Sequence, residues 1–510
     1  MNSPLRQVNT RWISGALGAM ALSLLLAWLS NRGQGLADWP AFLLVLLLCG
    51  AVFALAWRSI REGQPPRWLL LLTLGAILLR LALGAFWHLA LPEWGYDTPV
   101  QAAGYVMEDA FNRDAAAWRL AQSETPLSEA FRGYSVRDQY GGLLYVSAAV
   151  YRYSGANQHQ ALLVLMLSAT LSGLAVAYTW ALARGLWGER TARLAAWGLA
   201  LFPEAVLLGS SQMREAFSVA LTMAALYGLW RMRGAFSWRN SLLIVLPILL
   251  AIPLSWPFAA SLLGLLALAA LPLFGWQWLK RPLVWAPVAL LALAGAAWLF
   301  SSGASGDLWI VQSAEWQAYI SQHASGWVAR QFERMPLWGQ IPFLLIYGVF
   351  RPLLPAAIFA DGLPLWRAIA IWRALGWTLV LALLFFASYM ALRRRALFKL
   401  PGMLLLSNWA FILIASYRGG GDLWDSPRYR SAFAGIQLAL ASWAWVQQRE
   451  SEDPWLRRAL VGAGLMVAWF APWYLRRYAD FNWPLVELYQ VVGLGLASAA
   501  LYAIWDWLSA

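Results

Sequence analysis

Apolar runs of about 20 residues recur along the whole chain and constrain its fold more than any other feature. A helix of that length crosses the roughly 30 Å hydrocarbon core of a bilayer. The runs are continuous rather than alternating, which excludes an outer-membrane barrel and leaves helices. Only 12% of the residues are charged, about half the share usual in soluble domains. The sequence therefore predicts an all-α polytopic membrane protein with roughly 11–13 transmembrane helices.

The net charge of +13 does not indicate a nucleic-acid partner. The basic residues cluster in short loops between apolar runs, as cytoplasmic loops of membrane proteins do, and the 35 tryptophans suit the two membrane interfaces. The lone Cys49 lies inside an apolar run, and His88, His159 and His323 are far apart in the sequence. We therefore expect membrane lipids as partners, no nucleic acid, no disulfide framework and no His/Cys metal site.

The basic loops predict the orientation of the chain. Arg6 and Arg11 place the N-terminus in the cytoplasm, and the loop 58–67, with its three arginines, is cytoplasmic as well. The next helix then runs outward, so that the polar segment 92–158 is extracytoplasmic. The count continues through a crossing at about 194–208, two helices interrupted by "IPLSWP" at 252–257, and a helix at 284–300. It places the polar segment 301–340 outside too.

One apolar stretch, 341–359, does not fit a simple crossing. The run "RRR" at 393–395 is cytoplasmic by its charge, so the helix before it must run inward. The stretch is therefore re-entrant or lies on the outer surface, broken by "RPLLP" at 351–355, or one earlier helix does not cross. The sequence leaves these alternatives open.

Polar residues concentrate in the loops of the outer face rather than at the middle of the membrane. A channel or carrier places such groups at mid-membrane, so this arrangement favours chemistry at an interface. The acids are Glu93, Asp97, Glu108, Asp109, Asp114, Asp138, Asp422 and Asp425, and the bases are Arg113, Arg137, Arg214, Arg418, Arg428 and Arg430.

The first outer loop carries "RDAAAWRLAQ" (113–122), which resembles the acidic motif of the GT-C superfamily of glycosyltransferases. Asp114 matches the acid of that motif, Trp118 stands where Tyr is usual, and Ala121 is the small residue. Further on, "DQYGGLLYVSAAVYRYSG" (138–155) resembles the amphipathic helix that closes this loop.

Two later segments extend the resemblance loosely over residues 68–430. "AYTWALARGLWGERTARLAAWGLALFPE" (177–204) resembles a helix ending in a basic turn, followed by a helix ending at Pro. "YRGGGDLWDSPRYR" (417–430) resembles an outer loop with an R-x-R motif in bacterial members linked to cell-surface polysaccharide. The acidic loop follows the third helix here rather than the first, and Asp114 is followed by Ala115 where an Asp-Glu pair is common.

The resemblance divides the chain into four expected parts. Residues 1–60 are an added transmembrane hairpin, and 61–300 form the catalytic module that includes the outer loop 92–158. Residues 301–367 are a second extracytoplasmic or re-entrant segment, and 368–510 are C-terminal helices with the outer loop 418–430.

The resemblance also implies an activity. Members, among them the protein O-mannosyltransferases and the lipid A aminoarabinose transferase, use polyprenyl-phosphate sugars as donors. It implies transfer of a hexose or pentose to an extracytoplasmic lipid, polysaccharide or protein at the inner or plasma membrane. No cofactor is expected to be required, because the donor phosphate is a good leaving group, although a divalent metal is compatible with the reaction. A lipid-linked polysaccharide polymerase or ligase and a lipid or sugar transporter remain the alternatives. A polymerase would not need the early acidic loop, and a transporter would show internal repeats.

Such a reaction needs a base for the acceptor hydroxyl, and the first outer loop offers three acids. We expect Asp114 to be the base, with Arg113 pairing with Asp109 and leaving Asp114 free. Trp118 lies on the same helix and is expected to contact substrate. Asp138 is a second acid or a helix N-cap. The alternative for the whole group is a solvated, salt-bridged surface helix.

The departing phosphate needs cations, and arginine matches phosphate oxygens with its planar fork. We expect Arg428 and Arg430 to flank one anion, with Pro427 in the first turn of the helix that follows. Arg214 is a weaker candidate because Glu215 is beside it. Arg113 and Arg80 are expected to bind substrate as well, and Arg80, inside an apolar run, is expected to pair with an acid of the first outer loop. Ordinary interfacial snorkelling is the alternative for these arginines.

Overall fold

The computed structural model describes residues 4–61, 63–132, 138–234, 237–275, 326–419, 423–485 and 487–509. All the regular structure in these ranges is helical, and the elements are α1 (Pro4–Ser30), α2 (Trp39–Arg61), α3 (Arg67–Trp94), α4 (Pro99–Ala102), α5 (Glu108–Gln122), η1 (Leu127–Phe131), α6 (Gly142–Ser154), α7 (Ala161–Trp187), α8 (Glu189–Leu201), α9 (Pro203–Gly209), α10 (Arg214–Met232), α11 (Trp238–Leu254), α12 (Trp256–Phe274), α15 (Gly326–Arg334), α16 (Leu337–Phe350), α17 (Leu354–Phe359), α18 (Pro364–Arg393), α19 (Leu400–Arg418), η3 (Ser426–Phe433), α20 (Ala434–Ser451), α21 (Trp455–Ala479) and α22 (Leu488–Ser509).

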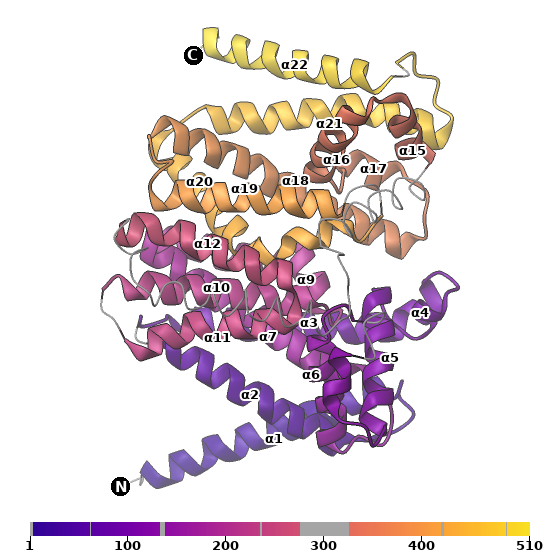
Figure 1. Cartoon of the computed structure of the whole chain (residues 1–510), viewed down its shortest axis with the longest axis vertical. Helices are drawn as coiled ribbons and strands as arrows, with labels where there is room; N and C mark the ends of the chain where they lie inside the picture. Colours follow the sequence, from indigo (N-terminus) through magenta and orange to yellow (C-terminus); the bar gives the residue numbers. More distant parts are fainter. Residues whose placement is uncertain are drawn as a thin grey trace.

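The long helices are stacked side by side along the long axis of the molecule (Figure 1). α1 and α2 lie at one end of the stack, and α21 and α22 lie at the other. α7 is the most enclosed of the candidate spans, with 89% of its apolar window buried. The short helices α4, α5 and α6 gather where several long helices end, on the right in Figure 1. The stack therefore presents one end of its helices to the loop that carries the predicted site.

Eight helices of the described part are long and apolar enough to cross a membrane, and nine if the bent pair α8 and α9 is one span. Three shorter apolar helices lie at Gly15–Ser30, Trp238–Leu254 and Trp338–Phe350. The chain is an all-α polytopic membrane protein, as predicted. The helix expected at 284–300 lies outside the described residues, so the total of 11–13 stays a prediction.

The breaks between helices follow proline. The stretch 341–359 consists of α16 and α17 with a break at Arg351–Leu353, which agrees with the predicted effect of "RPLLP". α11 ends and α12 begins around Ser255, whose side chain accepts a hydrogen bond from Phe258 N at 3.4 Å. The crossing expected over about 194–208 is not one continuous helix, because Pro203 starts a new helix bent by 52° from α8; together the two are long and apolar enough for one broken span.

The segment 92–158, expected to be the first outer loop, folds into the short helices α4, α5, η1 and α6 in its described part. α5 has Glu108 and Asp109 in its first turn and Arg119 in its last turn. This charge order stabilises a helix through its dipole. α6 begins after Gly141, whose φ of 76° lies in the left-handed region that favours glycine.

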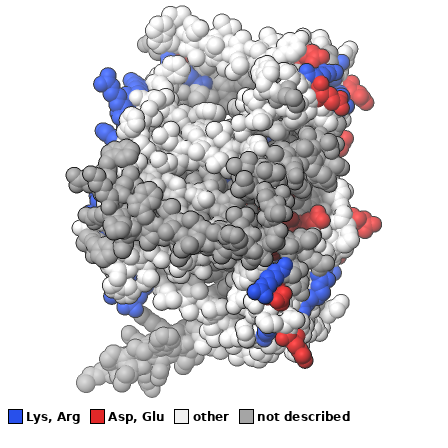
Figure 2. Space-filling model, viewed as in Figure 1, with Lys and Arg blue, Asp and Glu red and all other residues white. Residues whose placement is uncertain are grey.

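Charge is unevenly distributed between the two ends of the helices. Figure 2 shows that Lys and Arg line the left edge of this face without acids, whereas acids and bases mix along the right edge. The right edge is the side on which α5 and α6 lie (Figure 1).

Candidate functional site

Asp114 lies on α5 and faces a buried network of aromatic side chains. Its side chain is 1% exposed. The hydroxyl of Tyr105 donates to Oδ2 at 2.5 Å, the hydroxyl of Tyr151 on α6 lies 2.9 and 3.0 Å from the two oxygens, and His159 Nε2 lies 2.9 Å from Oδ2. Trp118 packs edge-on against Tyr151, with ring centroids 5.3 Å apart. Both carboxylate oxygens are therefore occupied within the protein.

This network corrects the expectation that Asp114 is free. Burial and the neighbouring carboxylate raise the pKa of Tyr105 and of Tyr151 well above the usual range, so both hydroxyls remain donors. A base must reach the proton of the acceptor, and here two tyrosines and a histidine stand in the way. The contacts make Asp114 a link between α5, α6 and the start of α7.

Asp109 lies one turn earlier on α5 and is the accessible acid of the three candidates. Its side chain is 45% exposed, and it forms an ion pair with Nη2 of Arg428 on η3. Arg428 is 5% exposed and also lies 3.2 Å from Asp425 and 3.9 Å from Glu215. The first outer loop and the R-x-R loop thus meet directly.

The electrostatics of this pair keep both groups charged. Burial alone would raise the pKa of Asp109, but Arg428, Arg113 and Arg214 outweigh it and lower that pKa below the usual range. Burial opposes the charge of Arg428 as well, but Tyr429, Asp109, Asp425 and Glu215 raise its pKa well above the usual range. Asp109 is therefore an anion at neutral pH.

Asp138 stabilises the start of α6 but is not its N-cap as expected, because Gly141 occupies that position. Its Oδ2 accepts a hydrogen bond from Leu144 N at 3.0 Å, in the first turn of α6. Its Oδ1 lies 3.8 Å from Nη1 of Arg214 and is buried without a hydrogen-bond partner in the described structure. The guanidinium of Arg214 also stacks on Tyr140 at 5.0 Å. The catalytic alternative for Asp138 remains a prediction.

Arg113 does not pair with Asp109 as expected. It is 2% exposed, and its Nη2 donates to the backbone carbonyl of Gln212, in the turn before α10. Burial lowers its pKa, opposed chiefly by Asp138. The expectation failed because spacing along one helix cannot reveal the turn that packs against it.

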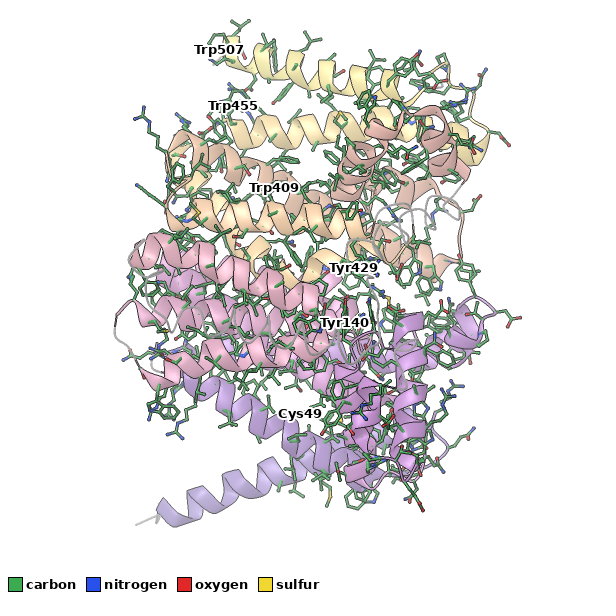
Figure 3. The ribbon with its side chains drawn as sticks, viewed as in Figure 1. Cys49, Tyr140, Trp409, Tyr429, Trp455 and Trp507 are labelled. Atoms are coloured by element: carbon green, nitrogen blue, oxygen red, sulfur yellow. The ribbon has the colours of Figure 1, made fainter. Side chains whose placement is uncertain are left out.

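Three acids and three bases thus form what we call the charged cluster, made of residues from α5, α6, α10 and η3 and their flanking turns. Its members are Asp109, Arg113, Asp138, Arg214, Glu215 and Arg428. A cavity of about 110 Å³ adjoins it and is lined by Arg214, Glu215, Ser255, Phe411 and Arg418 among others. Tyr140 and Tyr429 line the same cavity and lie toward each other at the junction of the first outer loop with the C-terminal half (Figure 3).

Arg430 has different partners from Arg428, so the expectation that the two flank one anion is not met. The Arg430 guanidinium lies over the Trp377 ring, 3.4 Å from its centroid, and donates to Gly348 O at 3.3 Å. Burial lowers the pKa of Arg430 to about 9, with Glu204 opposing and Arg373 and Arg351 adding to the decrease. Two residues of a 3₁₀ helix point to different sides, and here they face different neighbours.

Sequence reasoning missed the ion pair between Glu204 on α9 and Arg373 on α18. Nε and Nη2 of Arg373 donate to the two carboxylate oxygens at 2.8 Å, and both side chains are at most 5% exposed. The sequence contained a signal for this pair, because Glu204 and Arg373 are ionisable residues inside apolar runs, and such residues need a partner.

Arg80 is fully buried, and its expected partner was wrong. It donates to Ser172 Oγ at 2.8 Å, to Ala76 O at 2.9 Å, and to Leu199 O and Ala200 O at 3.3 Å. The last two are carbonyls at the C-terminal end of α8, which lack partners within the helix. Arg80 thus caps α8 where it breaks from α9.

Pro427 lies in the first turn of η3, as predicted. A Cβ on Gly419 would lie 2.9 Å from Ser426 O and 2.8 Å from the Tyr429 ring. This first glycine of the "GGG" run therefore lets α19 end closely against η3, and the other two lie outside the described residues. Among the described residues there is no group of three His, Cys, Asp or Glu side chains arranged to hold a metal ion.

No family model and no curated protein matches the sequence. Two solved structures from Archaeoglobus fulgidus show a likeness in shape. One is the oligosaccharyltransferase AglB in complex with an inhibitory peptide and a dolichol-phosphate, at 14% identity and a TM-score of 0.38, covering 86% of this chain and 55% of that chain. The other is the oligosaccharyltransferase tethered to an acceptor peptide containing the NVT sequon, at the same identity and TM-score, covering 86% and 54%.

This chain thus spans about half the length of the structures it matches.

Proposed function

We propose that this protein is an integral membrane glycosyltransferase that transfers a sugar from a polyprenyl-phosphate donor to an extracytoplasmic acceptor. The contact between Asp109 and Arg428 carries the proposal. It joins an accessible carboxylate to a buried guanidinium, the two groups that the reaction needs, from loops that both lie on the predicted outer face. The uneven charge at the two ends of the helices supports this orientation.

The chemistry assigns one role to each side of the contact. The anomeric carbon passes through a cation-like state as its bond to the phosphate oxygen breaks. The acceptor oxygen forms the new bond and gives its proton to the carboxylate of Asp109, and the phosphate leaves with the electron pair. Arg428 and Arg214 stabilise the negative charge that the phosphate gains.

The resting ion pair restrains this base. A carboxylate whose pKa is lowered by arginines is a weak proton acceptor, and general base catalysis improves as the pKa of the base approaches the working pH. A donor phosphate that replaces Asp109 as the partner of the Arg428 guanidinium releases the carboxylate and raises the pKa of Asp109. The base then becomes effective only when the donor is bound.

This reading moves the base from Asp114 to Asp109. Asp109 is 45% exposed and has a charged partner that a phosphate can replace. Asp114 is 1% exposed, with partners that hold the loop together.

The proposal is tested by incubating the purified protein with a panel of radiolabelled polyprenyl-phosphate sugars. Release or transfer of sugar, including slow transfer to water, is expected for at least one donor. Asp109→Asn should lower that rate by about 10²-fold or more, the usual contribution of a general base. Glu108→Gln, on the exposed neighbour in the same turn, is the matched control and should stay near wild type. An Asp109→Asn enzyme that retains more than a tenth of the activity would contradict the assignment.

A further inference from the structure

A second cavity lies outside the charged cluster, between the first outer loop, the turn from α17 to α18 and the end of α21. Its volume is about 490 Å³, within the roughly 300–1,000 Å³ of small-molecule sites. Its walls come from distant parts of the chain, with Tyr96 from the first outer loop, Arg367 from α18, Trp424 from the R-x-R loop and Arg477 from α21. No step of the proposed reaction uses these residues.

Guanidinium groups dominate the polar lining. Arg351, Arg367, Arg373 and Arg477 line the cavity, and Asp361 is the one carboxylate among its described lining residues. Arg373 is balanced by Glu204. The Nε of Arg367 donates to Ile358 O at 2.9 Å, and a carbonyl orients a guanidinium without cancelling its charge. A guanidinium group held in place in this way matches the oxygens of a phosphate or carboxylate group and loses little conformational entropy when it binds one.

Aromatic rings provide the remaining walls. The Tyr474 and Tyr478 rings are parallel within 2°, with centroids 6.1 Å apart. On another wall, Trp424 packs edge-on against Trp366 at 4.9 Å, and Trp366 Nε1 donates to Gln101 Oε1 at 3.0 Å. Flat rings with polar edges beside fixed guanidinium groups suit a ligand that is itself ring-shaped, hydroxylated and anionic.

We infer that this cavity binds an anionic saccharide, one that carries a phosphate or carboxylate group. We identify this saccharide as the acceptor of the transferred sugar, an identification that rests on the proposed function. Arg351 lines this cavity and also a smaller pocket that Arg430 lines. Trp424, which lines the cavity as well, belongs to the loop that carries Arg428. The acceptor would thus lie beside the donor site while contacting a different set of arginines.

Isothermal titration of the purified full-length protein tests this inference with three probes: glucose 1-phosphate, glucuronic acid and glucose. The two charged sugars should bind, and glucose should give no measurable heat. The double variant Arg367→Gln/Arg477→Gln should weaken the charged probes by at least about tenfold, the size of one lost charge-assisted hydrogen bond. Arg476→Gln, next to Arg477 but absent from the lining, is the matched control and should bind as wild type does.

Equal binding of glucose, or unchanged binding by the double variant, would overturn the inference. Arg428→Ala separates it from the proposed function. Glucose 1-phosphate should still bind that variant, and a loss there would place the ligand at the charged cluster instead. Binding by a protein that turns over no polyprenyl-phosphate donor would support the cavity while refuting the proposed reaction. Displacement of the probe by short-chain phosphatidylglycerol, with no binding of glucuronic acid, would make the ligand a lipid headgroup and overturn the saccharide assignment.

Discussion

At the scale of single residues, the two arginines of the R-x-R motif have different neighbours. Arg428 faces the charged cluster, whereas Arg430 lies over Trp377. We predict that Arg428→Ala lowers kcat/KM for the polyprenyl-phosphate donor by at least about 2 kcal/mol, the scale of one lost preorganised donor. Arg428→Lys should recover only part of this, because a point charge replaces the fork. Steady-state kinetics measure both, and a full rescue by lysine would refute bidentate phosphate binding.

Asp114 should act on stability rather than on the chemical step. Its carboxylate accepts from Tyr105 and Tyr151, and Asp114→Asn replaces one acceptor oxygen by a donor facing these hydroxyls. Hydrogen bonds to charged groups contribute about 1.5–3 kcal/mol each, so we expect a loss of about 3 kcal/mol in the free energy of unfolding.

Chemical denaturation in detergent measures the Asp114→Asn effect, and Glu108→Gln is again the control. A variant that keeps wild-type stability but loses all transfer would restore Asp114 as the base.

At this scale, the sequence could predict which polar residues gather into clusters better than it could predict their partners. Charges in an apolar chain stand out, and Asp109, Asp114, Arg214 and Arg428 all lie in the observed clusters. Their partners depend on contacts far along the chain, however, and Asp109 and Arg428 are 319 positions apart. Local spacing suggested Arg113 as the partner of Asp109, and only the packing of α5 on the turn before α10 shows otherwise.

At the scale of elements, one buried side chain stabilises the break that Pro203 makes between α8 and α9. Arg80 on α3 satisfies carbonyls of Leu199 and Ala200 that the end of α8 leaves open. An unsatisfied buried carbonyl costs about 1–3 kcal/mol. We predict that Arg80→Met, which keeps the length and apolar bulk of the side chain, lowers the unfolding free energy by about 3 kcal/mol.

The folded fraction of Arg80→Met should still bind donor, because Arg80 lies outside the charged cluster. Thermal unfolding measures the stability of the variant, and donor binding by the protein that remains folded measures whether the donor site is intact. Normal stability with lost donor binding would instead make Arg80 a substrate ligand, as first expected.

Helix breaks could be predicted from the sequence only where proline marks them. The interruptions at 252–257 and 351–355 both appear in the structure. The topology count took 194–208 as one crossing because Glu204 is its only charged residue, although the resemblance already implied a helix ending at Pro203. Proline at the first position of a helix is compatible with a new start as well as with an end, so the proline alone does not reveal the bend of 52°.

At the scale of the whole molecule, the charged cluster and the cavity lined by arginines lie at different places along the stack of helices. The charged cluster joins the first outer loop to η3, and the Arg-lined cavity joins that loop to the end of α21. Both use the ends of helices on the side where α4, α5 and α6 gather (Figure 1). A lipid-anchored donor and a polar acceptor can approach such a face from the membrane and from the aqueous phase respectively. The proposed function therefore requires this face to be extracytoplasmic.

Orientation can be tested with almost no background, because Cys49 is the single cysteine and is buried. Glu124 is exposed in the first outer loop, and Lys399 is exposed in the basic turn before α19. A membrane-impermeant maleimide should label Glu124→Cys in intact cells and leave Lys399→Cys unlabelled, because the positive-inside rule places the basic turn in the cytoplasm. Inside-out vesicles should give the reverse pattern, and the parent protein should stay unlabelled in both. Labelling of Lys399→Cys alone in intact cells would show that the charged cluster faces the cytoplasm, where an extracytoplasmic acceptor cannot reach Asp109.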